Sequence, residues 1–451
     1  MSSNGGSDLL GPLFGDAEVS AHLSDRARLQ AMLDTELALA EIEAELGIIP
    51  SQAVAAIAKT AHAEQFDIEA IAAEAAEAGN LAIPLVRHLT RAVEALDPDA
   101  ARYVHWGATS QDIIDTGLVL QLQRAVPIIL EHLDRAAAAA TAHARRYVDT
   151  PIPGRTWLQQ STPITFGVKA AGWFDAALRQ RSSLKEALEQ TRVLQFGGAS
   201  GTLASLGEHA PAAADRLALK LGLRSPSMSW HAYRDRLAHL ACALGVVCGT
   251  LGKIGRDVSL LAQTEVGEAA EGRSGGSSAM PHKQNPVAAS VAISASVRAP
   301  GLVATMLAAM PQEHERGLGG WQAEWPTLPE LVRLTAGAAR AIATLLEDLK
   351  IDVDRMRANL DMTGGLIASE AVALALAAHV GRSEAHGIVE RAARRTRSGS
   401  SFADSLSADP EVARHLTRTE IERHLSPERY VAAARAVVER VIGRMPKNET
   451  T

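Results

Sequence analysis

Apolar residues recur at every third or fourth position along most of this 451-residue chain. The repeat is clearest between residues 229 and 265, where it runs through Leu237, Leu240, Ala241, Leu244, Val247, Leu251, Ile254, Val258 and Leu261. This spacing matches the turn of an α-helix and predicts a helix roughly 50 Å long at about 1.5 Å per residue. Comparable patterns cover residues 116–147, 165–194, 286–310 and 329–349. The sequence therefore predicts an all-α fold around a central bundle of five long helices.

Shorter helical patterns flank the predicted bundle. On its N-terminal side, residues 24–46 keep a helical rhythm of apolar positions, and short helical patterns continue to about residue 99. After Asp361 the segments are short and amphipathic, and glycine or serine interrupts them at Gly364, Gly365 and residues 398–401. Because such breaks separate compact segments, we predict three helical domains: residues 1–112, 113–358 and 359–451.

Composition favours packed helices that associate with further helices. Hydrophobic residues make up 47% of the chain but aromatic residues only 4%, so the core must be mainly aliphatic, which favours helices over sheets. The helix predicted at residues 229–265 is apolar around much of its circumference and needs neighbours on more than one side. Its apolar run 237–252 could be a membrane span, but the run is shorter than about 18 residues and contains His239. We therefore expect an oligomer and no membrane partner.

The net charge of −7 gives the chain no global positive field. This argues against a nucleic-acid partner, and an anionic substrate must be bound by a local basic site. Cys242 and Cys248 point to different faces of a predicted helix, so we expect free thiols in a reducing cytosol rather than a disulfide. The N-terminal residues lack the charged and apolar regions of a signal peptide, which also fits a cytoplasmic protein.

The segment from Gly276 to Pro286 reads GSSAMPHKQNP and gathers a hydroxyl, a cation and a carboxamide in one loop. Glycine allows the backbone to adopt positive φ over a ligand, whereas proline restricts its course. Lys283 can supply a point charge for a carboxylate, and Asn285 can donate two N–H bonds. A Gly/Ser linker before a helix is the plainer interpretation. The combination of residues predicts a catalytic loop.

This segment matches the signature GSSxMPxKxNP of the fumarase/aspartase superfamily at all eight fixed positions. Two further segments match other blocks of that superfamily: residues 105–112 (HWGATSQD), and residues 154–159 (GRTWLQ) followed by 163–167 (PITFG). The resemblance therefore covers most of the chain. Within the superfamily the chain is most similar to the bacterial 3-carboxy-cis,cis-muconate cycloisomerases, through the letters TSQD, Trp157 and residues 314–325. The resemblance implies a cytoplasmic homotetramer with a shared helical core, composite active sites and no metal or organic cofactor.

The resemblance also implies roles for individual residues. The first serine of the signature exchanges a proton beside a carboxylate in the family, so Ser277 is expected to be catalytic, together with His105 and Lys283. Substrate binding is expected from Thr109, Ser110, Gln111, Arg155, Trp157, Gln159, Ser278, Met280, Asn285, His314 and Arg316.

Several of these positions have plainer interpretations when the residues are considered alone. They include a loop cap at Ser277, a core histidine at His105, a helix N-cap at Thr109 and Ser110, and exposed charges from His314 to Arg316. The remaining histidines show no metal-ligand spacing. Residues 196–202 (FGGASGT) lack the spacing of a phosphate-binding loop, so a tight connection between helices is expected there.

Two positions depart from many lyases of the superfamily, which carry a proton-transferring histidine and glutamate where this chain has Trp157 and Ser290. Without that pair, elimination of a strongly basic amine or hydroxide is difficult. A lactone instead releases a carboxylate, whose conjugate acid has a pKa of about 4. We therefore expect reversible cycloisomerisation of the tricarboxylate 3-carboxy-cis,cis-muconate to 4-carboxymuconolactone, in the protocatechuate branch of the β-ketoadipate pathway. The alternatives are a fumarate-releasing lyase such as adenylosuccinate lyase, with acid chemistry at His105 or His282, and a non-catalytic structural member of the fold.

Overall fold

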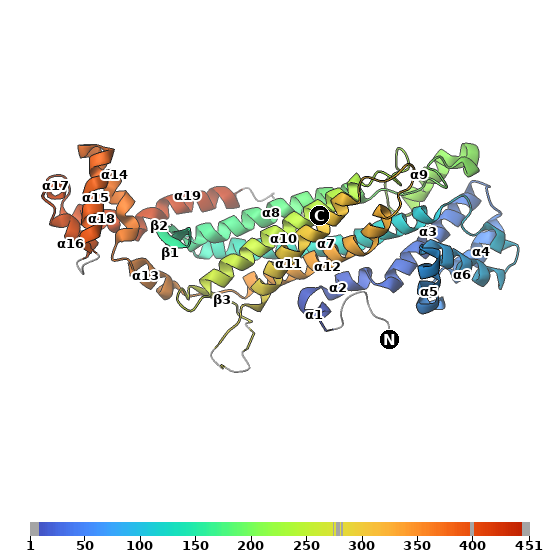
Figure 1. Cartoon of the computed structure of the whole chain (residues 1–451), viewed down its shortest axis with the longest axis horizontal. Helices are drawn as coiled ribbons and strands as arrows, with labels where there is room; N and C mark the ends of the chain where they lie inside the picture. Colours follow the sequence, from blue (N-terminus) through green and yellow to red (C-terminus); the bar gives the residue numbers. More distant parts are fainter. Residues whose placement is uncertain (1–8, 274, 277–279, 281–282, 397–400, 444–451) are drawn as a thin grey trace. The chain divides into compact units, whose positions relative to one another are not determined.

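The computed structural model describes residues 9–273, 275–276, 280, 283–396 and 401–443. These residues are mostly helical (Figure 1), which confirms the all-α prediction. All five predicted long helices are present: α7 (Ser110–Arg146), α8 (Phe166–Thr191), α10 (Asp235–Leu261), α11 (Val287–Ala308) and α12 (Gly320–Glu347). The predicted start of α12 at residue 329 is wrong. Proline typically occupies the first turn of a helix, but Pro326 and Pro329 both lie inside α12.

The chain forms two compact units. The first holds residues 1–133, 179–253 and 291–341, and the second holds residues 134–178, 254–290 and 342–451. The division falls within each of the five long helices, so each unit contains a portion of every one of them. The three domains expected from the sequence stay a prediction.

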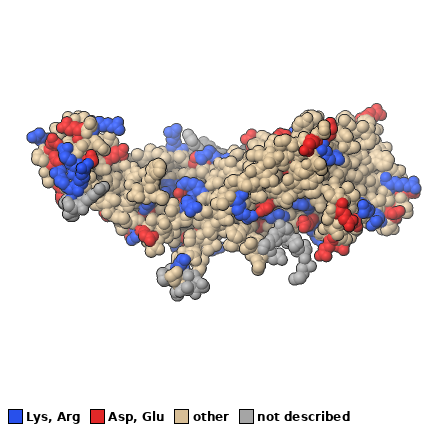
Figure 2. Space-filling view, viewed as in Figure 1, with Lys and Arg blue, Asp and Glu red and all other residues tan. Residues whose placement is uncertain are grey.

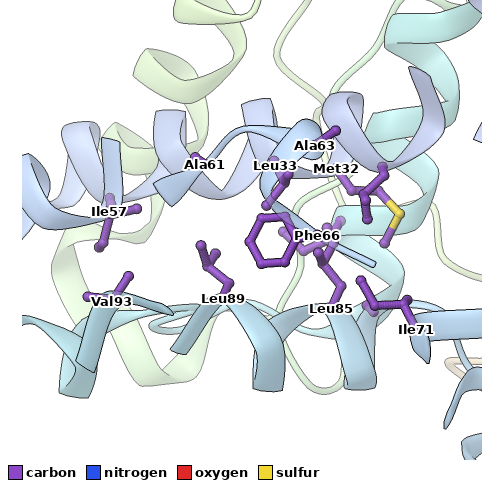
Figure 3. Packing of buried hydrophobic residues seen from close by; sticks show 14 of the residues in the cluster. Met32, Leu33, Ile57, Ala61, Ala63, Phe66, Ile71, Leu85, Leu89 and Val93 are labelled. Atoms are coloured by element: carbon purple, nitrogen blue, oxygen red, sulfur yellow. The ribbon is translucent and has the colours of Figure 1, made fainter. Parts of the chain in front are cut away.

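The first unit contains the N-terminal helices. They are α1 (Gly11–Phe14), α2 (Ala17–His22), α3 (Asp25–Glu45), α4 (Ser51–Thr60), η1 (Ala63–Gln65), α5 (Ile68–Ala78), α6 (Ala82–Glu94) and η2 (Ala100–Tyr103), followed later in the chain by η3 (Ala204–His209) and α9 (Ala210–Lys220). Leu33 of α3, Phe66 just after η1 and Leu89 of α6 belong to one buried cluster, which also includes Ile57 of α4 (Figure 3). The cluster extends to Ile113 and Ile114 of α7. Apolar burial therefore fixes the start of α7 against α3.

The second unit contains two short antiparallel sheets and the C-terminal helices. Strand β1 (Pro151–Thr156) pairs with β2 (Gln159–Thr165), and β3 (Ala269–Ala270) pairs with β4 (Lys350–Ile351). The later elements are α13 (Val353–Asp361), η4 (Leu366–Ala368), α14 (Ser369–Val380), α15 (Arg382–Thr396), α16 (Phe402–Ser407), α17 (Pro410–Ala413), α18 (Arg418–Leu425), η5 (Pro427–Tyr430) and α19 (Val431–Ile442). Leu376, Ile388 and Phe402 lie at the centre of their apolar core. The sequence analysis did not predict the β1–β2 hairpin.

Within the described part of the chain, three helices are long and apolar enough to span a membrane by length and composition: α7, α10 and α11. The bent pair α13 and α14 would make a fourth if it counted as one span. The length argument made for residues 237–252 therefore does not hold for α10, because the helix as a whole is long and apolar enough for a span. The protein buries 78% of the apolar window of α7 and 61% of that of α10, but only 28% of that of α11. Burial within the chain accounts for the composition of the first two helices.

The thiols and the surface charges follow the sequence analysis. Cys242 and Cys248 are both free, as predicted. Burial raises the pKa of the Cys248 thiol to about 11. On the face shown in Figure 2, acidic and basic side chains are interspersed rather than gathered into one field of a single sign. The expectation that neither nucleic acid nor a membrane is a partner stays a prediction.

Candidate active site

In the first unit, Asp112 fastens the loop that precedes α7. Its buried carboxylate accepts hydrogen bonds from the backbone N–H groups of Thr109 (3.0 Å), Gly197 (2.9 Å) and Gly198 (2.9 Å). The imidazole Nε2 of His231 lies 2.7 Å from the same carboxylate. A connection between helices was predicted at residues 196–202, and two of its three glycines, Gly197 and Gly198, donate their N–H groups to Asp112. This carboxylate therefore joins three segments that are distant in the sequence.

Arg316 brings together two further predicted site residues. Its guanidinium donates to Gln111 Oε1 (3.1 Å), to Thr109 Oγ1 (3.1 Å) and to the carbonyl oxygen of Ala199 (3.1 Å). All three acceptors are neutral, and within the described parts of the chain no carboxylate pairs with Arg316. Its positive charge is consequently available to an anionic ligand.

Buried partners fix the orientation of Gln111. The amide Nε2 donates to Asp115 Oδ2 (3.1 Å) and to the carbonyl of His231 (3.0 Å), which leaves Oε1 to accept from Arg316. Asp115 is itself held by Arg234 at 2.6 Å and by the indole N–H of Trp321 at 3.0 Å. The guanidinium of Arg316, which contacts the loop before α7, is therefore supported through Gln111 by a network of buried hydrogen bonds.

Arg234 lies between two buried carboxylates, Asp115 and Glu324, and all three side chains are 1% exposed. Burial lowers the pKa of Arg234, but both carboxylates outweigh it and raise this pKa above its usual range. Burial raises the pKa of Glu324. The sequence analysis missed this triad. The available signal was the single acidic residues Asp115 and Glu324 among apolar residues of α7 and α12, because Arg234 itself lies just before α10.

Ser110 has a partner that the sequence did not reveal. Asn80 Nδ2 donates to Ser110 Oγ at 3.0 Å, and Asn80 Oδ1 accepts from the N–H of Ala82 at 2.8 Å. Asn80 follows Gly79, whose φ of +62° ends α5, so the local sequence is typical of a helix stop rather than of a site.

The imidazole of His105 forms a hydrogen bond with a buried carboxylate. Its Nδ1 lies 2.7 Å from Glu36 Oε1, and the Glu36 side chain is 1% exposed. Burial is the largest influence and lowers the pKa of His105, but the charges of Glu36 and Asp112 outweigh it and keep this pKa above 6.5. His105 has a φ of +59°, which is uncommon for a residue with a side chain. His314 lies near Arg316 in the sequence, also has positive φ (+50°), and is exposed.

In the second unit, the signature loop is fixed at its base. Gly275 and Asn285 exchange two backbone hydrogen bonds of 3.0 and 2.8 Å. Glu271 accepts from the N–H groups of Ala288 (3.1 Å) and Ala289 (2.8 Å), at the start of α11. The amide of Asn285 donates to the carbonyl of Gly276 at 3.2 Å.

Two of the predicted loop residues, Ser277 and Ser278, lie outside the described residues, as does His282. Lys283 is exposed, and Met280 is 43% exposed. Their predicted roles, like that of Asn285, stay predictions.

The β1–β2 hairpin carries three predicted binding residues. Arg155 forms a bidentate pair with the fully buried Glu268 (2.6 and 2.8 Å), so its guanidinium is already matched within the unit. Trp157 and Leu158 form the turn of the hairpin with φ of +53° and +62°, and they are 97% and 79% exposed. Gln159 is exposed beside them.

The group around Arg316 can bind a carboxylate. The guanidinium of Arg316 is uncompensated and contacts the hydroxyl of Thr109. Ser110 follows Thr109 directly in the sequence, and His105 lies four residues before Thr109. The start of α7 adds N–H groups and the positive end of its dipole. Among the described residues, no cluster of three or more His, Cys, Asp or Glu side chains could hold a metal ion.

The chain is similar to known proteins in sequence and in structure. The lyase family model matches residues 16–301, and the model of the adenylosuccinate lyase C-terminus matches residues 365–441. The chain is 52% identical to a 3-carboxy-cis,cis-muconate cycloisomerase of Pseudomonas aeruginosa, covering 98% of this chain and 97% of that protein. It is 44% identical to a nitrosuccinate lyase of Streptomyces davaonensis, covering 97% and 94% of the two chains. The crystal structure of the 3-carboxy-cis,cis-muconate lactonizing enzyme from Pseudomonas putida superposes with a TM-score of 0.92, at 47% identity and with 97% and 98% coverage.

Proposed function

The chain belongs to the lyase family of the fumarase/aspartase superfamily, and we propose that it interconverts 3-carboxy-cis,cis-muconate and 4-carboxymuconolactone. The observation that carries this choice is the missing proton-transfer pair. Ser290 Oγ donates to the carbonyl of Val287 at 2.7 Å, and Trp157 has no acidic group. Neither residue can protonate a basic leaving group, whereas a carboxylate leaves or attacks without that help. The identity to cycloisomerases over nearly the full chain supports the same choice.

In the lactonising direction, one carboxylate of the substrate adds to the conjugated double bond of the same molecule. A C–O bond forms, and the electron pair of the double bond moves onto a neighbouring carboxylate as an aci-anion. One proton is then delivered to carbon, which completes the lactone. The reaction transfers no electrons to or from the protein, so the proposal requires no redox cofactor.

The residues of this chain would bind and stabilise charge during these steps. Arg316, with Thr109 and Ser110 beside it, would hold a substrate carboxylate. Lys283 would stabilise the aci-anion, an effect worth roughly 3–4 kcal/mol for a single preorganised donor. Ser277 would deliver the proton to carbon.

We extend the proposal to a homotetramer in which several copies complete each site. The exposed apolar side chains of Val246 (55%) and Val297 (73%), together with the low burial of α11, are suited to contact between copies. The strained and exposed turn at Trp157 is suited to insertion beside a substrate bound to another copy. A cytoplasmic location, without nucleic-acid or membrane partners, belongs to the same proposal.

The first test follows the absorbance of 3-carboxymuconate in the presence of purified protein. We expect turnover by the parent, loss of turnover in a folded Ser277→Ala variant, and a raised KM in Arg316→Gln. Exposed Arg382, replaced by glutamine, is the matched control and should behave as the parent. Full activity of Ser277→Ala would refute the role of that serine.

Composite sites are tested by mixing the Ser277→Ala and Arg316→Gln variants after mild dissociation. If different copies contribute the two residues, hybrids regain part of the parental activity, because some sites receive both intact residues. Activity that stays at the level of the separate variants, in hybrids verified by native mass spectrometry, would contradict composite sites.

Nitrosuccinate elimination is the second candidate, because a relative 44% identical to this chain is a nitrosuccinate lyase. Nitrite is a weakly basic leaving group, so the missing proton-transfer pair does not exclude this reaction. Fumarate formation from nitrosuccinate, measured alongside lactone formation, separates the candidates through the ratio of the two kcat/KM values. A ratio that favours nitrosuccinate would replace the cycloisomerase proposal.

A further inference from the structure

Two buried carboxylates lie behind His105 on one face of α3. Glu36 and Glu43 are two helical turns apart, and their side chains therefore point the same way. Counted over the whole residue, Glu36 is 2% exposed and Glu43 is 0% exposed. Glu36 Oε1 binds His105, but Glu36 Oε2 and both oxygens of Glu43 have no hydrogen-bond partner among the described residues.

Glu43 reaches the loop that carries His105. A Cβ atom placed on Gly107 would lie 3.5 Å from Glu43 Oε1, so this carboxyl lies against the backbone of the loop. Two neighbouring carboxylates in a buried, weakly solvated site cannot both be charged without a large penalty. Of the two carboxylates, Glu36 alone has a basic partner among the residues that the structure describes. The negative charge therefore resides on Glu36, and Glu43 keeps its proton.

We propose that Glu36 is a positioning residue that holds His105 as the imidazolium for the reaction, while neutral Glu43 lets Glu36 alone carry negative charge. This inference deepens the proposed function and rests on it. With Nδ1–H donating to Glu36, the Nε2–H of His105 has no partner within the described residues. It can therefore donate a hydrogen bond to a carboxylate of the substrate, and the positive charge of the imidazolium strengthens that bond.

The charges around the pair agree with this assignment. Glu36 of α3 and Asp112 of α7 are the charged groups that act on His105, and together they hold its pKa above 6.5. His231 in turn lies against Asp112 at 2.7 Å. Burial and the neighbouring Glu36 raise the pKa of Glu43 from 4.5 to about 8.

The test measures the charge on His105 without using the reaction. Of the two protonation states of histidine, diethyl pyrocarbonate reacts with the neutral imidazole. The pH dependence of labelling at His105, followed by mass spectrometry of its peptide, therefore gives the titration midpoint of this side chain. We expect a midpoint above 6.5 in the parent. In Glu36→Gln it should fall by about 1–3 pH units, because burial remains and the opposite charge is gone. Glu36→Asp, which keeps the charge, should retain part of the elevation.

A parental midpoint at or below 6.5 would overturn the inference, even if no variant folds. A midpoint that does not move in folded Glu36→Gln would also overturn it. Glu45→Gln, at an exposed glutamate of the same helix, is the control and should leave the midpoint unchanged.

The catalytic part of the inference is tested through the pH profile of kcat/KM. Its alkaline limb should move to lower pH in Glu36→Gln together with the labelling midpoint. A limb that stays in place while the midpoint moves would show that the reaction does not use the charge on His105. Absence of cycloisomerase activity in the parent would instead refute the proposed function, and the labelling result would still decide the charge state.

Discussion

Replacing Glu43 by glutamine should stabilise this protein, and the gain should depend on pH. In the folded chain, burial and Glu36 raise the pKa of Glu43 from 4.5 to about 8. Between these two pH values the unfolded chain releases a proton that the folded chain keeps. The free energy of unfolding therefore falls as pH rises across this interval, by about 1.4 kcal/mol per pH unit.

The expected size of the effect follows from the width of this interval. The penalty is below about 1 kcal/mol at pH 5, about 3 kcal/mol at pH 7, and levels off near 5 kcal/mol above pH 8. Glutamine has nearly the same shape and no charge to lose, so Glu43→Gln removes most of this penalty. The difference between variant and parent should be small at pH 5 and largest above pH 8.

Urea denaturation at pH 5, 7 and 8.5 measures this difference, at one fixed protein concentration because association also affects stability. Glu45→Gln is the matched control, since Glu45 lies on the same helix with a side chain 54% exposed. A Glu43→Gln variant that is destabilised equally at all three pH values would refute the reasoning. That result would mean that Glu43 is ionised in the folded protein and stabilised by a partner.

Three further predictions concern other contacts. Arg234→Gln should lower the free energy of unfolding in urea by about 3–5 kcal/mol, because two buried carboxylates lose their cation; an unchanged midpoint would show that both are neutral. Trp157→Asn combined with Leu158→Gly introduces the pair that favours a type I′ turn, so the melting temperature should rise, while kcat/KM should fall about tenfold with the loss of the aromatic contact. Parental activity in this double variant would show that Trp157 does not contribute to the active site. Asp112→Asn should raise KM and lower the melting temperature by several degrees, because one carboxylate oxygen that accepts from backbone N–H groups is replaced by a donor; wild-type values of both would contradict the fastening role.

Helical periodicity predicted the long helices because each depends on local spacing and on a continuous apolar face. The start of α12 depends instead on distant partners. Trp321 donates to Asp115 of α7, and Glu324 pairs with Arg234, which precedes α10, so the first turns of α12 are fixed by contacts with distant segments. The β1–β2 hairpin is likewise defined by pairing, and its turn at Trp157 and Leu158 lacks the glycine or asparagine that usually marks such a turn.

The candidate site was predictable where a motif is contiguous and unpredictable where partners converge. Thr109 and Gln111 belong to one motif, and the structure places both against Arg316. Their expected role in substrate binding stays a prediction. Asn80 and Glu36 come from other helices, and no local pattern connects them to the loop before α7. For Glu36, the sequence signal was a charged residue among the apolar positions of a long helix.

The buried triad of Asp115, Arg234 and Glu324 also constrains how this protein can change under random mutagenesis. Replacement of Arg234 alone leaves two carboxylates without their cation in an apolar interior, and replacement of one carboxylate leaves Arg234 with a single anionic partner. Simultaneous exchange of the whole set for apolar side chains can instead be tolerated. Functional variants in a large library should therefore keep the three positions together or lose them together, and intermediates should be rare. Such epistasis would be visible in deep sequencing of the selected pool, without any knowledge of the substrate.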